Sequence, residues 1–150
     1  MKISILTAYP NIFPGALGCS VMGNALKKNL WSLEIVNLHD FGCDERKSID
    51  DEPFGGGPGM VIRPDVIEKA LISFGEKIIK NSQLIYMTPS GFPLNQKKLS
   101  ELSQKKHLII LCGRFEGVDE RAIKELNFDE ISIGDYVLAG GEIASKVLVE

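Results

Sequence analysis

The chain has 150 residues, of which 44% are hydrophobic and 25% are charged, with a formal net charge of −3. This length and composition indicate one globular domain with a substantial core, and they exclude a disordered chain. The negative net charge argues against a domain that holds nucleic acid by bulk charge alone, although a local basic face would still suit RNA.

The N-terminal part of the chain is predicted to form two strands separated by a helix. Alternating residues from Lys2 to Ala8 predict the first strand, and Tyr9-Pro10 ends it because the residue before proline avoids helical backbone. A helix is expected between Asn11 and Leu30, clearest from Val21 onward, and a second strand from Leu33 to Leu38. The N-terminus has no signal-peptide pattern and no apolar run reaches membrane-spanning length, so we expect a cytoplasmic protein without membrane contact.

The stretch from Asp40 to Met60 is charged and then glycine-rich. It is long for a loop without secondary structure, and such loops are commonly functional or disordered. Composition alone favours a flexible set of turns for Gly55 to Gly59. The glycine spacing fits neither a dinucleotide-binding fingerprint nor a phosphate-binding P-loop.

The rest of the chain alternates helices with strands. Arg63 to Lys80 predicts the best helix, whose apolar stripe should lie in the core and consists of Ile67, Leu71, Phe74 and Ile78. In chain order we then expect a strand at Gln83 to Met87 stopped by Thr88-Pro89-Ser90-Gly91, a helix at Leu94 to Lys106, a strand at His107 to Cys112, a short helix at Val118 to Leu126, a strand at Asp129 to Ile133, and a helix at Gly141 to Glu150.

This alternation predicts an α/β fold with a largely parallel sheet. The lysines of the Leu94 to Lys106 helix are explained more simply as a solvated face than as an RNA contact. Nothing caps the last helix at Glu150, so we expect the polypeptide to continue in related proteins.

Three strand ends are followed by glycine-marked turns: Thr88 to Gly91, Gly113 to Gly117, and Gly134 to Gly141. The stretch Ile131 to Glu142 runs from a strand through an apolar loop to a helix start, which is where open α/β sheets bind ligands. Recognition by backbone groups and apolar walls suits a flat heterocycle such as adenine better than a triphosphate. The alternative is a buried connection that holds no ligand.

Few side chains suggest catalysis or metal binding. His107, at a strand start, favours a structural polar role. Glu116, between two glycines at an expected helix start, is the carboxylate of most interest, and its alternative role is that of a helix-dipole partner. The isolated Cys19, Cys43 and Cys112 are interpreted as reduced and mostly packing cysteines. No metal-ligand cluster is present, although a Mg²⁺ dependence would leave little trace in a sequence.

Four motifs together resemble a known family. They are D-D-E-P-F-G-G-G-P-G-M at Asp50 to Met60, Y-M-T-P at Tyr86 to Pro89, G-R-F-E-G-V-D-E-R at Gly113 to Arg121, and S-I-G-D-Y-V-L-A-G-G-E at Ser132 to Glu142. In this order they are similar to the bacterial tRNA (guanine-N1-)-methyltransferases of the SPOUT superfamily, over nearly the whole chain. The departures are small: Phe54 and Phe115 stand where that family commonly has tyrosine, and Ala139 where it often has serine or threonine.

The resemblance implies a SPOUT fold with a trefoil knot on the C-terminal side, an exception to the rule that chains are unknotted. It also implies a homodimer that binds S-adenosylmethionine in residues 1–150 and methylates N1 of guanosine 37 in tRNA, beside the anticodon. The implied cofactor-binding residues are Tyr86, Pro89, Gly113, Glu116, Ile133, Gly134, Asp135, Tyr136, Val137, Leu138, Gly140 and Gly141. The implied substrate-side loop contains Asp50, Gly55, Gly56, Gly57, Pro58 and Gly59.

In that family the general base is an aspartate and its helper an arginine, and the resemblance implies that both lie beyond Glu150. A C-terminal helical tRNA-binding domain would follow them. Glu116 is then the matching carboxylate nearest the reaction, in a supporting role. We therefore expect residues 1–150 to bind the cofactor but to transfer methyl groups poorly. Two alternatives stay open: a non-catalytic S-adenosylmethionine-binding dimer derived from such an enzyme, and a different nucleotide-binding α/β module.

Overall fold

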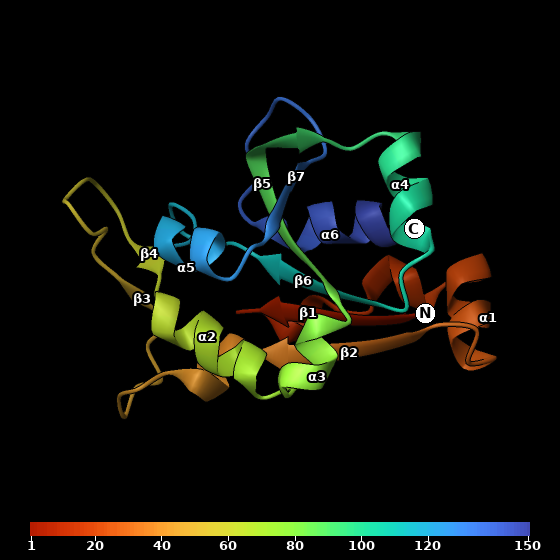
Figure 1. The fold of residues 1–150 in the computed structure, drawn as a ribbon, viewed down its shortest axis with the longest axis horizontal. Helices are drawn as coiled ribbons and strands as arrows, with labels where there is room; N and C mark the ends of the chain where they lie inside the picture. The colour runs from red at the N-terminus through yellow and green to blue at the C-terminus, as the bar shows by residue number, and fades with distance from the viewer.

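A five-stranded sheet with the strand order β2-β1-β6-β5-β7 forms the centre of the molecule (Figure 1). The computed structural model describes all residues from Met1 to Glu150. The strands of this sheet are β1 (Lys2–Thr7), β2 (Ser32–Asn37), β5 (Gln83–Pro93), β6 (His107–Cys112) and β7 (Asp129–Ser132). Every pairing within it is parallel, which confirms the predicted α/β class with a largely parallel sheet.

Helices cover both faces of the sheet (Figure 1), and each face has its own hydrophobic core. The first face packs against α2 (Pro64–Ile72) and α5 (Glu120–Glu125), with Ile79 of α3 (Glu76–Lys80) at its edge. The second face packs against α1 (Ser20–Lys27), α4 (Gln96–Ser103) and α6 (Gly141–Val149). All six residues of β6 are buried, as expected for a central parallel strand whose apolar run serves both faces.

Smaller elements occupy the segments between these. They are three 3₁₀ helices, η1 (Pro10–Ile12), η2 (Gly15–Gly18) and η3 (Leu38–Phe41), and the two short strands β3 (Asp50–Asp51) and β4 (Val61–Ile62), which pair antiparallel. The stretch from Asp40 to Met60 is therefore not structureless, because η3 begins before it and the β3–β4 ladder closes its glycine-rich part. No helix combines the length and apolar character needed to cross a membrane.

The predicted helix from Arg63 to Lys80 is wrong as a single element. It breaks after Ile72, and Gly75 adopts a left-handed φ of 82° that redirects the chain into α3. Ile67 and Leu71 are buried as expected, whereas Ile78 is 42% exposed. The apolar spacing predicted the first two turns correctly, but the break rotates the last member of the stripe away from the core.

The predicted end of the third long strand is also wrong. Instead of stopping at Thr88, β5 runs to Pro93, with a register irregularity between Met87 and Phe92. It pairs with β6 only as far as Met87, and beyond the irregularity it pairs with β7 alone. The proline and glycine in this segment suit an irregular, one-sided pairing, because a proline cannot donate to a second neighbouring strand.

Two further expectations need correction. The helix expected between Asn11 and Leu30 is reduced to α1, preceded by η1 and η2, and Leu30 lies outside it and is exposed. Of the cysteines, only Cys112 is a packing residue, since Cys19 and Cys43 are exposed. The structural role predicted for His107 is confirmed: the ring is buried and lies 2.9 Å from Ser4 Oγ and 2.9 Å from Ser82 Oγ.

Candidate cofactor-binding site

The three glycine-marked turns meet around one cavity of about 370 Å³. Its walls come from the irregular part of β5, from the turn between β6 and α5, and from the segment between β7 and α6. The lining comprises Tyr86, Met87, Thr88, Pro89, Ser90, Gly113, Arg114, Phe115, Glu116, Gly117, Ile131, Ser132, Ile133, Gly134, Tyr136, Val137, Leu138, Ala139, Gly140, Gly141 and Ala144. The cavity therefore lies at the carboxyl ends of three neighbouring parallel strands, where ligands bind in open α/β sheets.

The structure brings together all but one of the residues expected to bind a cofactor. Asp135 is the exception, because it is not part of the lining. Sequence reasoning did not single out several residues that do line the cavity, namely Met87, Thr88, Ser90, Arg114, Phe115, Gly117, Ile131, Ser132, Ala139 and Ala144. Most of these residues lie within the four quoted motifs, next to residues that were expected to bind the cofactor, and that adjacency could have identified them.

Glycines bring main chain close to main chain at the back of the cavity. The N–H of Gly141 donates to the carbonyl oxygen of Gly113 at 3.0 Å. A β-carbon on Gly141 would lie 2.8 Å from Cα of Cys112, and one on Gly113 would lie 3.0 Å from the ring of Tyr86. Burial raises the pKa of the Tyr86 phenol, which therefore stays protonated at neutral pH. Close main-chain packing thus forms this part of the wall, and it leaves backbone groups exposed to a ligand.

A buried ion pair crosses the same wall. Glu142, only 1% exposed, lies in the first turn of α6, and its Oε2 is 2.9 Å from Nη2 of Arg114. Its Oε1 accepts hydrogen bonds from Thr7 Oγ1 at 2.8 Å and from Arg114 Nε at 3.2 Å. The guanidinium of Arg114 also donates to the carbonyl of Ala139 at 3.1 Å and lies 4.4 Å from the ring centre of Tyr9. Arg114 thus joins two walls of the cavity through one buried carboxylate.

The glycine-rich loop from Asp50 to Gly59 is fixed to the cavity through Glu116. The N–H of Glu116 donates to the carbonyl of Met60 at 2.9 Å. Gly59 has a φ of +79°, and a β-carbon there would collide with Cγ of Glu116. The ring of Phe54, on the same loop, lies 4.3 Å from the guanidinium carbon of Arg121. Glu116 therefore faces the cavity and supports the loop at the same time.

Other members of the loop are placed less tightly. Gly55, Gly56 and Gly57 all have positive φ, and a β-carbon at any of them would meet no other atom within 4 Å. Pro58 is exposed, and Asp50 pairs with Ile62 in the β3–β4 ladder. The loop tip is thus open to solvent, while both of its ends are held by backbone pairing.

The suggested helix-dipole role of Glu116 is wrong. The helix α5 starts at Glu120, and its capping residue is Asp119, whose Oδ1 accepts from the N–H of Arg121 at 3.0 Å. Glu116 instead lies in a turn between Phe115, with φ 58°, and Gly117, with φ 123°. Its side chain lies against Gly59, at the end of the glycine-rich loop.

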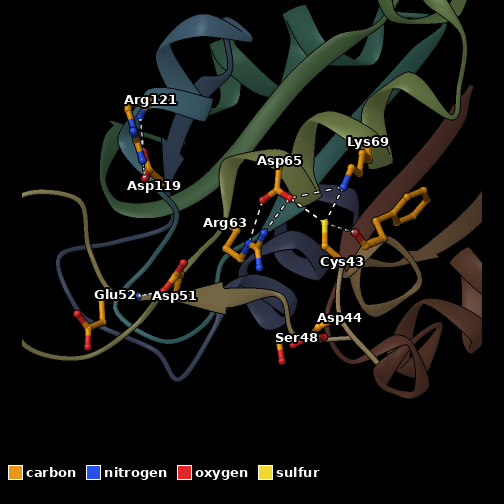
Figure 2. A network of polar contacts seen from close by, with 11 residues as sticks. Cys43, Asp44, Ser48, Asp51, Glu52, Arg63, Asp65, Lys69, Asp119 and Arg121 are labelled. Atoms are coloured by element: carbon orange, nitrogen blue, oxygen red, sulfur yellow. Dashed lines mark hydrogen bonds and ion pairs between the residues drawn. The ribbon is translucent and has the colours of Figure 1, made fainter. Parts of the chain in front are cut away.

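A polar network joins Cys43, in the segment after η3, to the first turns of α2 (Figure 2). Asp65 accepts from Arg63 Nε at 3.0 Å and from the thiol of Cys43 at 2.9 Å, and Lys69 lies 3.5 Å away. Partial burial acts to raise the pKa of Asp65, but the hydrogen bonds from Cys43 and Arg63 outweigh it and hold the pKa at about 2. The carboxylate is therefore charged at all ordinary pH values and holds Cys43, just after η3, against α2.

The structure gathers no group of three or more histidine, cysteine, aspartate or glutamate residues that would hold a metal ion. The residues that line the cavity instead provide backbone amides and carbonyls, apolar side chains, five hydroxyl-bearing side chains (Tyr86, Thr88, Ser90, Ser132 and Tyr136), one arginine and one glutamate. Such a lining suits an organic ligand with a flat apolar part and a small number of polar atoms.

The fold and the cavity define this chain as an α/β domain with a pocket at the carboxyl ends of parallel strands. The chain belongs to the tRNA (Guanine-1)-methyltransferase TrmD family, whose sequence pattern matches residues 1–150.

Curated relatives agree with that family. The chain is 48% identical over 152 residues to the tRNA (guanine-N(1)-)-methyltransferase of Ehrlichia ruminantium (strain Gardel), which covers 99% of this chain and 63% of that protein. It is 46% identical over 150 residues to the enzyme of the same name from Rickettsia akari (strain Hartford), covering 100% of this chain and 64% of the relative. The corresponding protein of Wolbachia pipientis subsp. Culex pipiens (strain wPip) is 49% identical over 152 residues, covering 99% and 64%. The chain thus spans a little under two thirds of the length of these relatives.

Proposed function

We propose that this domain binds S-adenosylmethionine as the methyl donor of a tRNA (guanine37-N1)-methyltransferase. The observation that carries the proposal is the cavity at the three glycine-marked turns, in a chain whose relatives are named tRNA methyltransferases. The proposal includes the SPOUT fold with its trefoil knot and a homodimeric assembly, both expected from the family resemblance.

The residues present fit this cofactor. The cavity volume of about 370 Å³ falls in the range of small-molecule sites. Gly113, Gly140 and Gly141 are packed so closely that a β-carbon at each would meet a neighbouring atom at 3.0 Å or less. Because they carry no side chain, their main-chain groups stay free to approach an adenine edge. Ile133, Val137 and Leu138 supply apolar walls for its faces. The cofactor, when bound, supplies a methyl group already activated by a sulfonium centre.

The task left to the protein is then mainly alignment of two reactants. In this proposal, backbone groups of the cavity orient the cofactor, and the loop from Asp50 to Gly59, which contacts the lining residue Glu116 through Gly59, receives the guanine. N1 of guanine carries a proton at neutral pH, so methylation requires a general base. We assign Glu116 a supporting role, because its side chain packs under Gly59 and positions the loop. The base and its arginine helper are expected from residues that the family resemblance places after Glu150.

Exposed apolar residues beside the cavity support the homodimer. Val137 and Leu138 are exposed in the loop before α6, and Ile143 and Val147 lie one turn apart on the exposed side of that helix. A monomer rarely leaves such a group of apolar side chains in water, and they are continuous with the proposed cofactor site. Sedimentation at micromolar concentration is the direct check, and a monomer would contradict this part of the proposal.

Calorimetric titration of S-adenosylmethionine tests the cofactor assignment. Saturable binding that is lost in the Gly140→Val, Gly141→Val double variant supports it, and absence of binding to the unaltered chain contradicts it. The second arm assays methyl transfer, which should be slow with residues 1–150, to a tRNA with guanosine 37 and to a matched tRNA with adenosine 37. Formation of N1-methylguanosine in the first tRNA alone supports the substrate assignment, whereas equal modification of both contradicts it.

A further inference from the structure

The buried pair of Arg114 and Glu142 does more than join two walls, because it also sets the charge around the cavity. Arg114 and Glu116 are the charged residues in the lining, and Glu142 lies directly behind Arg114. Together these three groups carry one positive and two negative charges. Without Glu142, the arginine would face the cavity with no carboxylate in contact with it.

The position of Glu142 makes its charge effective. The residue is 1% exposed, so water screens its carboxylate very little. Its Oε1 is compensated by Thr7 and Arg114, but its Oε2 receives no aligned hydrogen bond, although it lies 2.9 Å from Nη2 of Arg114. Two positive features lie nearby, the guanidinium of Arg114 and the N-terminal end of the α6 dipole. Glu142 is the group that offsets both.

We infer that Glu142 is a specificity-determining residue that makes the pocket favour a cationic sulfonium ligand over the neutral thioether left after methyl transfer. This inference rests on the proposed function, since it concerns the same cavity. The two ligands have nearly the same shape and the same adenosine and amino-acid parts, so they differ for the protein mainly in one positive charge and one methyl group. A nearby buried negative charge therefore separates them by electrostatics rather than by fit.

Calorimetric titrations with S-adenosylmethionine and S-adenosylhomocysteine provide the test. In Glu142→Gln, which keeps the shape but removes the charge, affinity for the sulfonium ligand should fall about tenfold more than affinity for the thioether. Glu142→Asp should restore most of the wild-type ratio. Thr7→Val removes the hydrogen bond to the same carboxylate without changing any charge, so it should lower thermal stability and leave the ratio of the two affinities unchanged.

The ratio distinguishes this role from a purely structural one, because a distorted pocket weakens both ligands alike. An unchanged ratio in Glu142→Gln overturns the inference and leaves the cofactor assignment intact. If neither ligand binds the wild-type chain, the cofactor assignment fails and the inference fails with it. Should Glu142→Gln not fold, Arg114→Gln decides, since removing the positive partner should shift the ratio toward the sulfonium ligand. A shift toward the thioether, or no shift, overturns the inference.

Discussion

The N–H of Gly141 donates a 3.0 Å hydrogen bond to the carbonyl oxygen of Gly113, so the start of α6 is joined by main chain to the turn after β6. Two of the three walls of the cavity are thereby fixed relative to each other without any side chain. The arginine that follows Gly113 in sequence pairs with the glutamate that follows Gly141. A backbone contact and a buried ion pair thus connect the same two segments, and the pocket depends on both.

Substitution of Gly141 should damage the pocket more than substitution of Gly140. In Gly141→Ala the new methyl group would lie 2.8 Å from Cα of Cys112, which is backbone of the central strand and cannot yield. In Gly140→Ala it would meet side-chain atoms of Arg114 and Glu142, so the ion pair must shift but no backbone of the sheet has to move. We expect Gly141→Ala to lower the free energy of unfolding by about 1–3 kcal/mol and Gly140→Ala by less. Urea denaturation of both variants measures this, and equal losses would contradict it.

Removal of the Phe54 ring should loosen the glycine-rich loop without destabilising the protein. The ring is 80% exposed, and its cation–π contact with Arg121 is at the surface, where such contacts are weak. We expect Phe54→Leu to change the free energy of unfolding by less than about 0.5 kcal/mol. Amide exchange in the loop should become faster, because the tip would lose its contact with α5. Phe92→Leu, another exposed aromatic away from this loop, is the matched control, and unchanged exchange in Phe54→Leu would refute the prediction.

His107 should make the protein less stable as the pH falls below neutral. Burial and the nearby Lys2 hold its pKa below the ordinary value of 6.5, while Glu34 acts weakly in the other direction. The unfolded chain therefore binds a proton more readily than the folded protein, so the free energy of unfolding decreases as the pH falls below 6.5. In His107→Gln the decrease in melting temperature between about pH 7.5 and pH 5 should be smaller than in the wild type. The same decrease in both proteins would show that other groups cause it.

Asp65 should contribute stability that is lost only in strong acid. Its pKa is lowered from 3.8 to about 2. Its contribution to the free energy of unfolding is therefore complete above the unfolded pKa of 3.8 and disappears as the pH falls from there toward 2. Because the side chain is 36% exposed, we expect the contribution to be below about 1 kcal/mol. Asp65→Asn should be less stable than the wild type at neutral pH, and the two should converge near pH 2. Glu76→Gln, which removes an ion pair at the surface, is the control, and no convergence would contradict the assignment.

The sequence predicted the strands of the sheet well, because their signal is local. An uninterrupted apolar run such as His107 to Cys112 is needed in a strand covered on both faces, and the structure confirms it. The glycine-marked segments were also evident, and they do meet at one cavity, although the first of them, Thr88 to Gly91, is an irregular part of β5 and not a turn after it. The break at Gly75 was missed because apolar spacing continues across it to Ile78, and spacing alone does not report a left-handed residue.

Sequence by itself determined the α/β class, the order of the elements and the turns that form the cavity, since these follow from short-range patterns of apolar residues and glycines. Tertiary structure alone decided that β5 continues beside β7, that Glu116 packs under Gly59, and that Glu142 is buried against Arg114. Each of these contacts joins segments far apart in the chain. The energy of such a contact depends on which groups the fold brings together, and the residues next to either partner in the sequence do not determine this.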